Sequence, residues 1–179
     1  MSVKLTRLQI VAALKALDYE CKRRGITGEI CIYGGAEMVL VFDARDATRD
    51  VDAIFRPKSE IREAAQAVAE DLGLPETWLN DGVKGYIARR EELTERPISE
   101  LGALSNLRLT WPSADYLLAM KCIAARIADY DTDGDRRDVE FLIKSLSLRE
   151  PGEVFERIER FYSKDFIHVK TRYFVEEIL

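Results

Sequence analysis

Two aspartates, Asp50 and Asp52, open an apolar run in the segment "TRDVDAIF". In a strand, residues i and i+2 project to the same side, so these two carboxylates point together. Carboxylates held that close repel each other unless a cation lies between them. Hard divalent cations such as Mg²⁺ favour such oxygen donors and also bind substrate phosphates. The pair therefore predicts a cation site, and the open alternative is a solvated pair of acids at a strand end.

A glycine pair precedes the acids. Gly34 and Gly35 follow the apolar run "EICIY" and precede "AEMVLVF", which can form a short helix. Backbone amides in a glycine turn at the start of a helix form an anion site suited to phosphate. The motifs G-x-x-x-x-G-K-[ST] and G-x-G-x-x-G do not occur in the sequence. A phosphate-binding turn is thus one interpretation, and an ordinary tight turn is the other.

The apolar spacing predicts the elements that must position these groups. A helix over 5–24 stops at Gly25, and "EICIY" and "DVDAIF" are expected to be buried strands. A second helix is expected in "SEIREAAQAVAEDLG", with Ser59 as its cap and Gly73 as its stop. The region that follows is irregular and contains one strand, in "LSNLRLTW". Four helices then follow in "PSADYLLAMKCIAARIADY", "RRDVEFLIKSL", "EPGEVFERIERFYS" and "DFIHVKTRYFVEEIL", the first starting near Ser113 or Asp115 and ending before "DTDGD".

Composition limits the classes of protein. With 179 residues, 47% of them hydrophobic and 33% charged, the chain suits one domain or one compact unit with two lobes. Neither an apolar run of about 18 residues nor a signal peptide is present, so we expect a cytoplasmic protein without a membrane span. A net charge of −5 argues against a broad nucleic-acid-binding surface, and three scattered cysteines with one histidine argue against a zinc site.

The combination of strand, glycine pair, short helix and D-x-D strand resembles the nucleotidyltransferase superfamily with the DNA polymerase β-like core. In particular, "GGAEMVLVFDARDATRDVDAIF" is similar to the GG-A…R-x-x-T-x-D-x-D pattern of AbiEii-like and related uncharacterised bacterial nucleotidyltransferases. The resemblance implies that Asp50 and Asp52 are catalytic and bind Mg²⁺ or Mn²⁺. It also implies that Gly34, Gly35 and Thr48 bind the nucleotide.

Two later segments extend the resemblance. "LLAMKCIAAR" is similar to the family's K-x-x-x-x-R helix, and "DRRDVEFL" is similar to the acidic helix that follows it. The resemblance implies nucleotide-binding roles for Lys121, Arg126 and Asp138, and a catalytic role for Lys121 as well. From the residues alone, Lys121 either snorkels at the edge of an apolar helix, contacts a phosphate or pairs with Asp138.

One part of the family pattern is missing. Active members carry a third carboxylate on a later strand, but the expected strand "LSNLRLTW" contains no acid. Asp81, in "WLND", is the best substitute as a third metal ligand. We expect Trp78 and Trp111 to be core or boundary residues, and His168 to lie at the surface.

The expected fold is α+β, with a small mixed-sheet nucleotidyltransferase core over residues 1–110 and a C-terminal helical bundle over 111–179. The expected function is metal-dependent transfer of a nucleotide from an NTP to RNA, tRNA or a protein. The AbiEii-like resemblance adds a toxin–antitoxin role with a cognate partner. The alternative is a catalytically inactive module of the same fold that binds a nucleotide or a partner protein. A sugar-nucleotide glycosyltransferase is a third reading, against which the short chain and the glycine pair argue.

Overall fold

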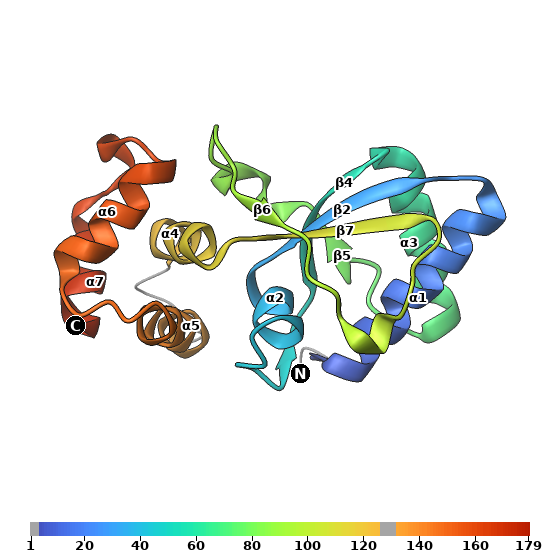
Figure 1. The fold of residues 1–179 in the computed structure, drawn as a ribbon. Coiled ribbons are helices and arrows are strands. Elements are labelled where there is room, and N and C mark those ends of the chain that lie inside the picture. The colour runs from blue at the N-terminus through green and yellow to red at the C-terminus, as the bar shows by residue number, and fades with distance from the viewer. Residues whose placement is uncertain (1–3, 126–131) are drawn as a thin grey trace. The chain divides into compact units, whose positions relative to one another are not determined.

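The structure is a computed structural model that describes residues 4–125 and 132–179. Within these ranges it contains seven α-helices and seven strands (Figure 1). The helices are α1 (Arg7–Arg24), α2 (Gly34–Leu40), α3 (Lys58–Leu72), α4 (Ala114–Ala124), α5 (Thr132–Ser145), α6 (Pro151–Phe161) and α7 (Val169–Ile178). The strands are β1 (Leu5–Thr6), β2 (Gly28–Tyr33), β3 (Ala47–Thr48), β4 (Val51–Arg56), β5 (Leu79–Asn80), β6 (Leu93–Thr94) and β7 (Leu107–Pro112).

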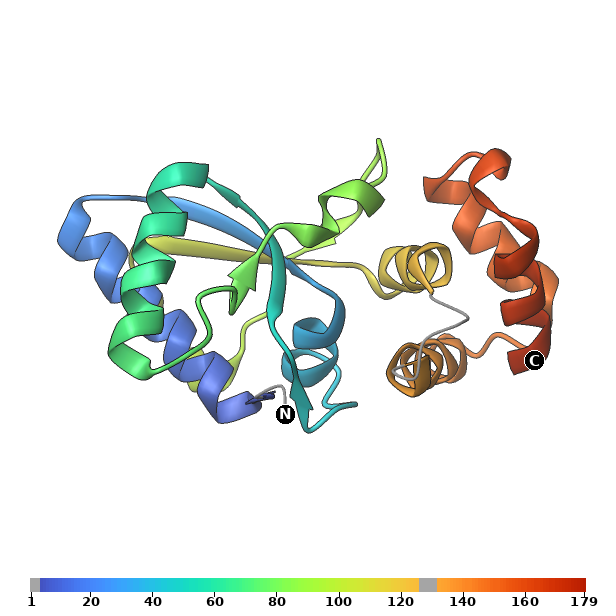
Figure 2. The ribbon, with the colours of Figure 1, turned by 180° about the vertical axis from the view of Figure 1, so that it is seen from behind.

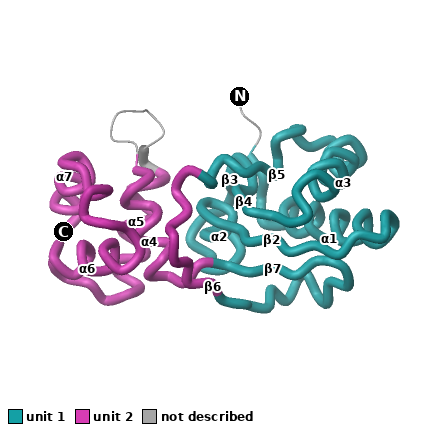
Figure 3. Tube along the Cα trace, turned by 90° about the horizontal axis from the view of Figure 1, so that it is seen from above, with its two compact units in different colours: residues 1–84, 94–111 teal, residues 85–93, 112–179 magenta. Residues whose placement is uncertain are grey.

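The chain divides into two compact units, coloured separately in Figure 3. The first comprises residues 1–84 and 94–111, and the second comprises 85–93 and 112–179. The sequence suggested a single division between 110 and 111, so the difference is the segment 85–93. Hydrogen bonds tie this segment to the helical unit: the Ala88 N–H donates to the Tyr116 hydroxyl (3.0 Å), and the Ser113 N–H donates to the Glu92 carbonyl (2.8 Å).

The main sheet of the first unit is mixed, as the sequence predicts. Its strand order is β5-β4-β2-β7-β6. Strand β2 runs antiparallel to β4 and parallel to β7, and β5 runs parallel to β4. The long strands β2 and β4 therefore form the centre, and the short strand β5 lies at the edge beside β4.

The core of the first unit lies on one face of this sheet. Ile30 and Ile32 of β2, with Val51 and Ala53 of β4, are fully buried there together with apolar residues of α1 and α3. Figures 1 and 2 show α1 and α3 side by side along the sheet. Alternate residues of β2 and β4 face the other side, which leaves Asp52 on the face opposite to this core.

Two tryptophans complete that core. Trp78 and Trp111 are both fully buried, which confirms their expected role as core residues. The Trp78 indole N–H donates to the Ala65 carbonyl of α3 (2.9 Å), so its polar atom is satisfied inside the protein.

The limits of the helices agree only partly with the sequence. Helices α1 and α3 end at Gly25 and Gly73, as predicted. The prediction that Ser59 caps α3 is wrong, because the helix begins at Lys58 and Pro57 occupies the N-cap position. The predicted start of α5 at Arg136 is also wrong, since the helix already begins at Thr132.

A second, two-stranded sheet was not predicted. Strand β1 pairs antiparallel with β3, with Leu5 opposite Thr48 and Thr6 opposite Ala47. The side chain of Thr6 also caps α1 by accepting from the Gln9 N–H. The pairing fixes the position of Thr48 just before the two aspartates.

The second unit is helical. Helix α4 packs against α5, α6 and α7, and its residues 116–122 are buried. Ser113 caps α4, as predicted, by accepting from the Tyr116 N–H. The rings of Tyr116 and Phe161 stack with centroids 4.9 Å apart, joining α4 to α6. His168 is exposed, as expected.

Candidate functional site

The two aspartates lie at the start of strand β4. Along the strand, Val51 and Ala53 are buried in the core, whereas Asp52 is half-buried on the opposite side. Asp50 directly precedes the strand and is half-buried as well. The alternation that the sequence predicts is present at Asp52, whose carboxylate lies on the face away from the core. Asp50 lies outside the strand and is placed by its contact with Asn80.

The glycine turn lies next to these acids. Tyr33, the last residue of β2, pairs with Asp52 across the sheet, and the chain turns at Gly34 with a φ of +66°. A Cβ atom built on Gly34 would lie 3.5 Å from Asp52 Oδ2. The backbone of the turn and the carboxylate therefore meet without an intervening side chain.

Gly35 is closely packed against Thr48. A Cβ atom on Gly35 would lie 2.4 Å from Thr48 Oγ1 and 3.4 Å from Arg45 Nη1. Thr48 is buried, and β1 holds its backbone. The resemblance implied that Thr48 binds the nucleotide; the structure places its hydroxyl against the turn, where it supports the backbone of Gly35.

This contact makes Gly35→Ala a test of the turn. We expect the variant to lose about 1–3 kcal/mol of stability, because the added methyl group must displace Thr48. Gly35→Ala combined with Thr48→Ala should recover part of the loss, since the Thr48 Cβ would remain 3.1 Å away. Urea unfolding measures both effects. Gly85→Ala is the control, because nothing lies within 4 Å of its added Cβ. Equal stability of Gly35→Ala and wild type would contradict the packing.

Asn80 and Asp81 have opposite surroundings. Asn80 pairs with Asp52 in the ladder between β4 and β5, and its Nδ2 donates to Asp50 Oδ2 (3.1 Å). Asp81 instead forms ion pairs with Lys58 (2.6 Å) and Arg62 (3.2 Å) of α3. The sequence singled out Asp81 as the third metal ligand, but its neighbour Asn80 is the residue that contacts the acids.

The pKa values of Asp50 and Asp81 are shifted in opposite directions. Burial raises the pKa of Asp50, and the hydrogen bond from Asn80 and the charge of Arg49 oppose that rise. The hydrogen bond and charge of Lys58 lower the pKa of Asp81. Asp50 is thus a carboxylate whose ionisation the fold disfavours, which is the behaviour expected of an acid that a bound cation stabilises.

The raised pKa predicts a pH-dependent effect of Asp50→Asn. The pKa of Asp50 is higher in the folded than in the unfolded protein, so folding favours the protonated carboxyl group. The stability that Asp50 contributes is therefore fully present below its pKa in the unfolded chain, and it is lost as the pH rises through its pKa in the folded protein. In metal-free buffer the variant should have a higher Tm than wild type at pH 7. The difference should vanish below the ordinary aspartate pKa of about 3.9. Melting curves across pH test this, with the exposed Asp46→Asn as control; a Tm at pH 7 equal to wild type would count against it.

Lys121 and Asp138, both in the second unit, pair with each other. Lys121 Nζ lies 2.5 Å from Asp138 Oδ2 and 3.7 Å from Asp135 Oδ1. The Lys121 side chain is 8% exposed and that of Asp138 is 1% exposed. The pairing alternative for Lys121 is confirmed, and the snorkelling alternative is wrong because the ammonium group is buried. Arg126, the third predicted residue of this group, lies outside the described residues.

The donor set at the aspartates fits a hard divalent cation that also binds substrate. In the part of the chain that the structure describes, no three His, Cys, Asp or Glu side chains cluster as a metal site. Mg²⁺, however, is commonly held by one or two carboxylates together with waters and substrate phosphates. The adjacent pair Asp50 and Asp52 could meet that need, and the glycine turn adjoins Asp52.

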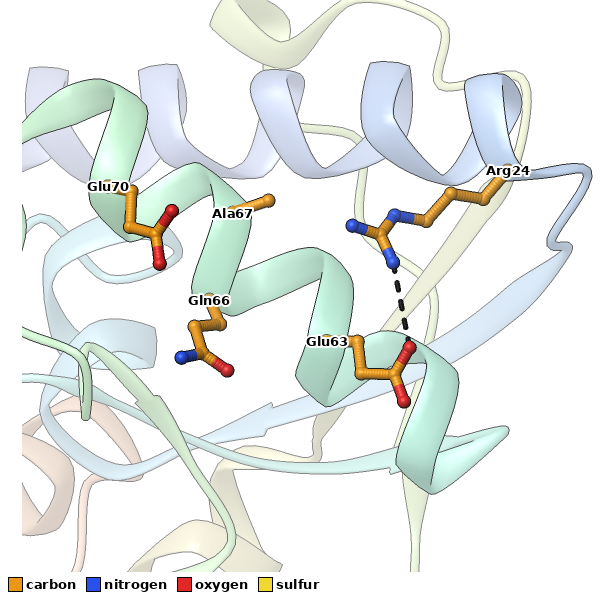
Figure 4. A pocket seen from close by; sticks show the side chains of 5 residues that line it. All are labelled: Arg24, Glu63, Gln66, Ala67 and Glu70. Atoms are coloured by element: carbon orange, nitrogen blue, oxygen red, sulfur yellow. Dashed lines mark ion pairs between the residues drawn. The ribbon is translucent and has the colours of Figure 1, made fainter.

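A groove elsewhere on the first unit contains none of the predicted residues. It has a volume of about 290 Å³ between α1 and α3, and Figure 4 shows its side chains. Arg24 and Glu63 pair across it at 3.6 Å. The groove is lined by Arg24, Glu63, Gln66, Ala67 and Glu70. This lining contains no histidine, cysteine, serine, threonine or lysine and does not resemble a catalytic centre.

Comparison with known proteins yields no relative: no family model matches the chain, and no curated protein or solved structure is significantly similar to it. No helix within residues 4–125 and 132–179 is both long and apolar enough to cross a bilayer.

Proposed function

We propose that this protein is a metal-dependent nucleotidyltransferase, which transfers a nucleotide from an NTP to an acceptor on RNA, tRNA or a protein. One observation carries the proposal: the Asp52 carboxylate lies 3.5 Å from the Cβ position of Gly34. Carboxylates that could bind a cation and the backbone of the glycine turn therefore adjoin each other in the first unit. That combination suits a metal–triphosphate complex better than either ligand alone.

The residues divide the work between them. Asp50 and Asp52 would hold Mg²⁺ or Mn²⁺, and the turn at Gly34 and Gly35 would bind the phosphates. The bound cation would neutralise the triphosphate and orient it for in-line attack. Thr48 keeps the turn in place by its contact with Gly35. Positioning and charge compensation are the main catalytic contributions that such a site can make.

The residues of the second unit have a less direct claim to nucleotide binding. Lys121 and Asp138 neutralise each other inside the helical unit. The ion pair accounts for both buried charges without a bound nucleotide. A nucleotide-binding role for these two residues stays a prediction. The same holds for a toxin–antitoxin partner, which only the resemblance of the sequence supports.

The second candidate function is a catalytically inactive module that keeps the site for binding. Two observations favour it. Strand β7, with the sequence "LRLTWP", has no acid, and Asp81 is engaged with Lys58 and Arg62. A base to deprotonate the acceptor hydroxyl is therefore not evident among the described residues of the main sheet.

Transfer of label distinguishes the two functions. The protein is incubated with each NTP radiolabelled on the α-phosphate, with Mg²⁺ or Mn²⁺, and with total cellular RNA and protein. We expect label on an acceptor with wild type and with Asp46→Asn, but none with Asp50→Asn combined with Asp52→Asn. Metal-dependent NTP binding without transfer would select the inactive module. If the protein neither binds the NTP nor transfers the label, both functions are overturned.

A further inference from the structure

The loop after β5 is fastened to the aspartates at one residue and to helix α3 at the next. Asn80 contacts Asp50, whereas Asp81 pairs with Lys58 and Arg62. Building on the proposed metal site, we infer that Asn80 is a positioning residue that fixes the orientation of the Asp50 carboxylate. Asp81, by contrast, serves as the anchor of the loop.

Both ends of the Asn80 amide are used. Its Oδ1 accepts from the Gly82 N–H (2.9 Å), and its Nδ2 donates to Asp50 Oδ2 (3.1 Å). Because a backbone N–H can only donate, the Gly82 contact fixes which end of the amide is oxygen. The NH₂ group must then face Asp50, because an ionised carboxylate accepts hydrogen bonds and cannot donate them. Asn80 therefore selects one orientation of that carboxylate.

The loop around Asn80 has no space for a side chain at position 82. A Cβ atom on Gly82 would lie 2.9 Å from Asn80 Oδ1 and 3.7 Å from Asp52 Oδ1. A side chain at this position would thus push against the amide and approach the second acid. In addition, the Asp81 carboxylate is only 18% exposed between its cationic partners of α3. The segment that follows Asn80 is consequently held in place.

This arrangement gives Asn80 the role of a group that supports a ligand. Groups that orient metal ligands typically contribute about 10- to 100-fold to metal affinity. Asn80 acts through Asp50, so its loss should weaken cation binding without removing a donor oxygen from the cation. The site would then depend on two carboxylates, one of them held by an amide, in place of a set of three.

Two measurements on the full chain test the inference. Without metal, the side-chain NH₂ resonances of Asn80 in a ¹⁵N NMR spectrum should shift in Asp50→Asn and stay in place in Asp46→Asn. With Mn²⁺ alone, followed by electron paramagnetic resonance of the free ion, Asn80→Ala and Asn80→Leu should bind about 10- to 100-fold more weakly than wild type. Asn106→Ala is the matched control, because Asn106 is also half-buried and donates one amide hydrogen bond, to the Ile26 carbonyl (2.9 Å).

The outcomes separate this inference from the proposed function. If Asn80→Ala binds Mn²⁺ as tightly as wild type, the positioning role is overturned and the proposed function stands. Unmoved Asn80 resonances in Asp50→Asn would likewise overturn it. If wild type does not bind Mn²⁺, the proposed metal site fails, and the inference fails with it. Equal weakening in Asn106→Ala would assign the loss to general destabilisation and would also overturn the positioning role.

Discussion

Asp50→Asn combined with Asp52→Asn is expected to abolish metal-dependent NTP binding, with a loss of affinity of more than about 100-fold. Loss of a group that only supports a ligand typically costs about 10- to 100-fold, and this double variant removes both carboxylates. The fold should survive, because neither side chain lies in the core. Titration calorimetry with Mg²⁺ and each NTP measures the effect.

Two controls define what the double variant means. Asp46→Asn changes an exposed acid of the same loop and should bind as wild type does. Far-ultraviolet circular dichroism should show unaltered secondary structure in both variants. Wild-type affinity in the double variant would remove the aspartates from the site and, with them, the basis of the proposed function.

Lys121→Ala is expected to destabilise the protein by about 3–5 kcal/mol, the cost typical of breaking a buried ion pair. The Asp138 carboxylate, 1% exposed, would lose the ammonium group that lies 2.5 Å away. Lys121→Met combined with Asp138→Leu should recover most of this loss, because no buried charge remains. The Lys121→Ala substitution should therefore lower the stability of the protein more than it lowers the affinity for NTP.

The measurement must follow the unit that contains the pair. Both tryptophans, Trp78 and Trp111, belong to the first unit, so fluorescence follows that unit. The second unit is helical, and circular dichroism during urea unfolding reports on it. Lys144→Ala, an exposed lysine of α5, is the control and should change stability by less than about 0.5 kcal/mol. A Lys121→Ala variant as stable as wild type would show that the pair contributes nothing.

Local patterns of the sequence were sufficient to predict the strand that carries Asp52 and the glycines that end two helices. The period of two in "DVDAIF" placed Asp52 on the side opposite to Val51, and the glycines at 25 and 73 marked the ends of two helices. These features depend on neighbours in the chain. The helical second half followed from the same periodic signals, whereas the expectation of a mixed sheet came from the resemblance to the nucleotidyltransferase superfamily.

Features that depend on distant partners could not be predicted. Strand β5 has two residues, too few for a period, so the sequence could not distinguish Asn80 from Asp81 as the residue facing the acids. Only the register with β4 decides this, since Asp52 pairs with Asn80. Likewise, the burial of Lys121 depends on the helices that surround α4, and the membership of 85–93 in the second unit depends on hydrogen bonds to α4 and its cap.

The small sheet of β1 and β3 has a practical consequence for recombinant versions of the protein. Leu5, fully buried, lies opposite Thr48, whose hydroxyl group contacts the Cα region of Gly35. Truncations or fusions that remove or displace Leu5 are therefore expected to disturb the glycine turn through Thr48. Affinity tags at the other terminus avoid that disturbance.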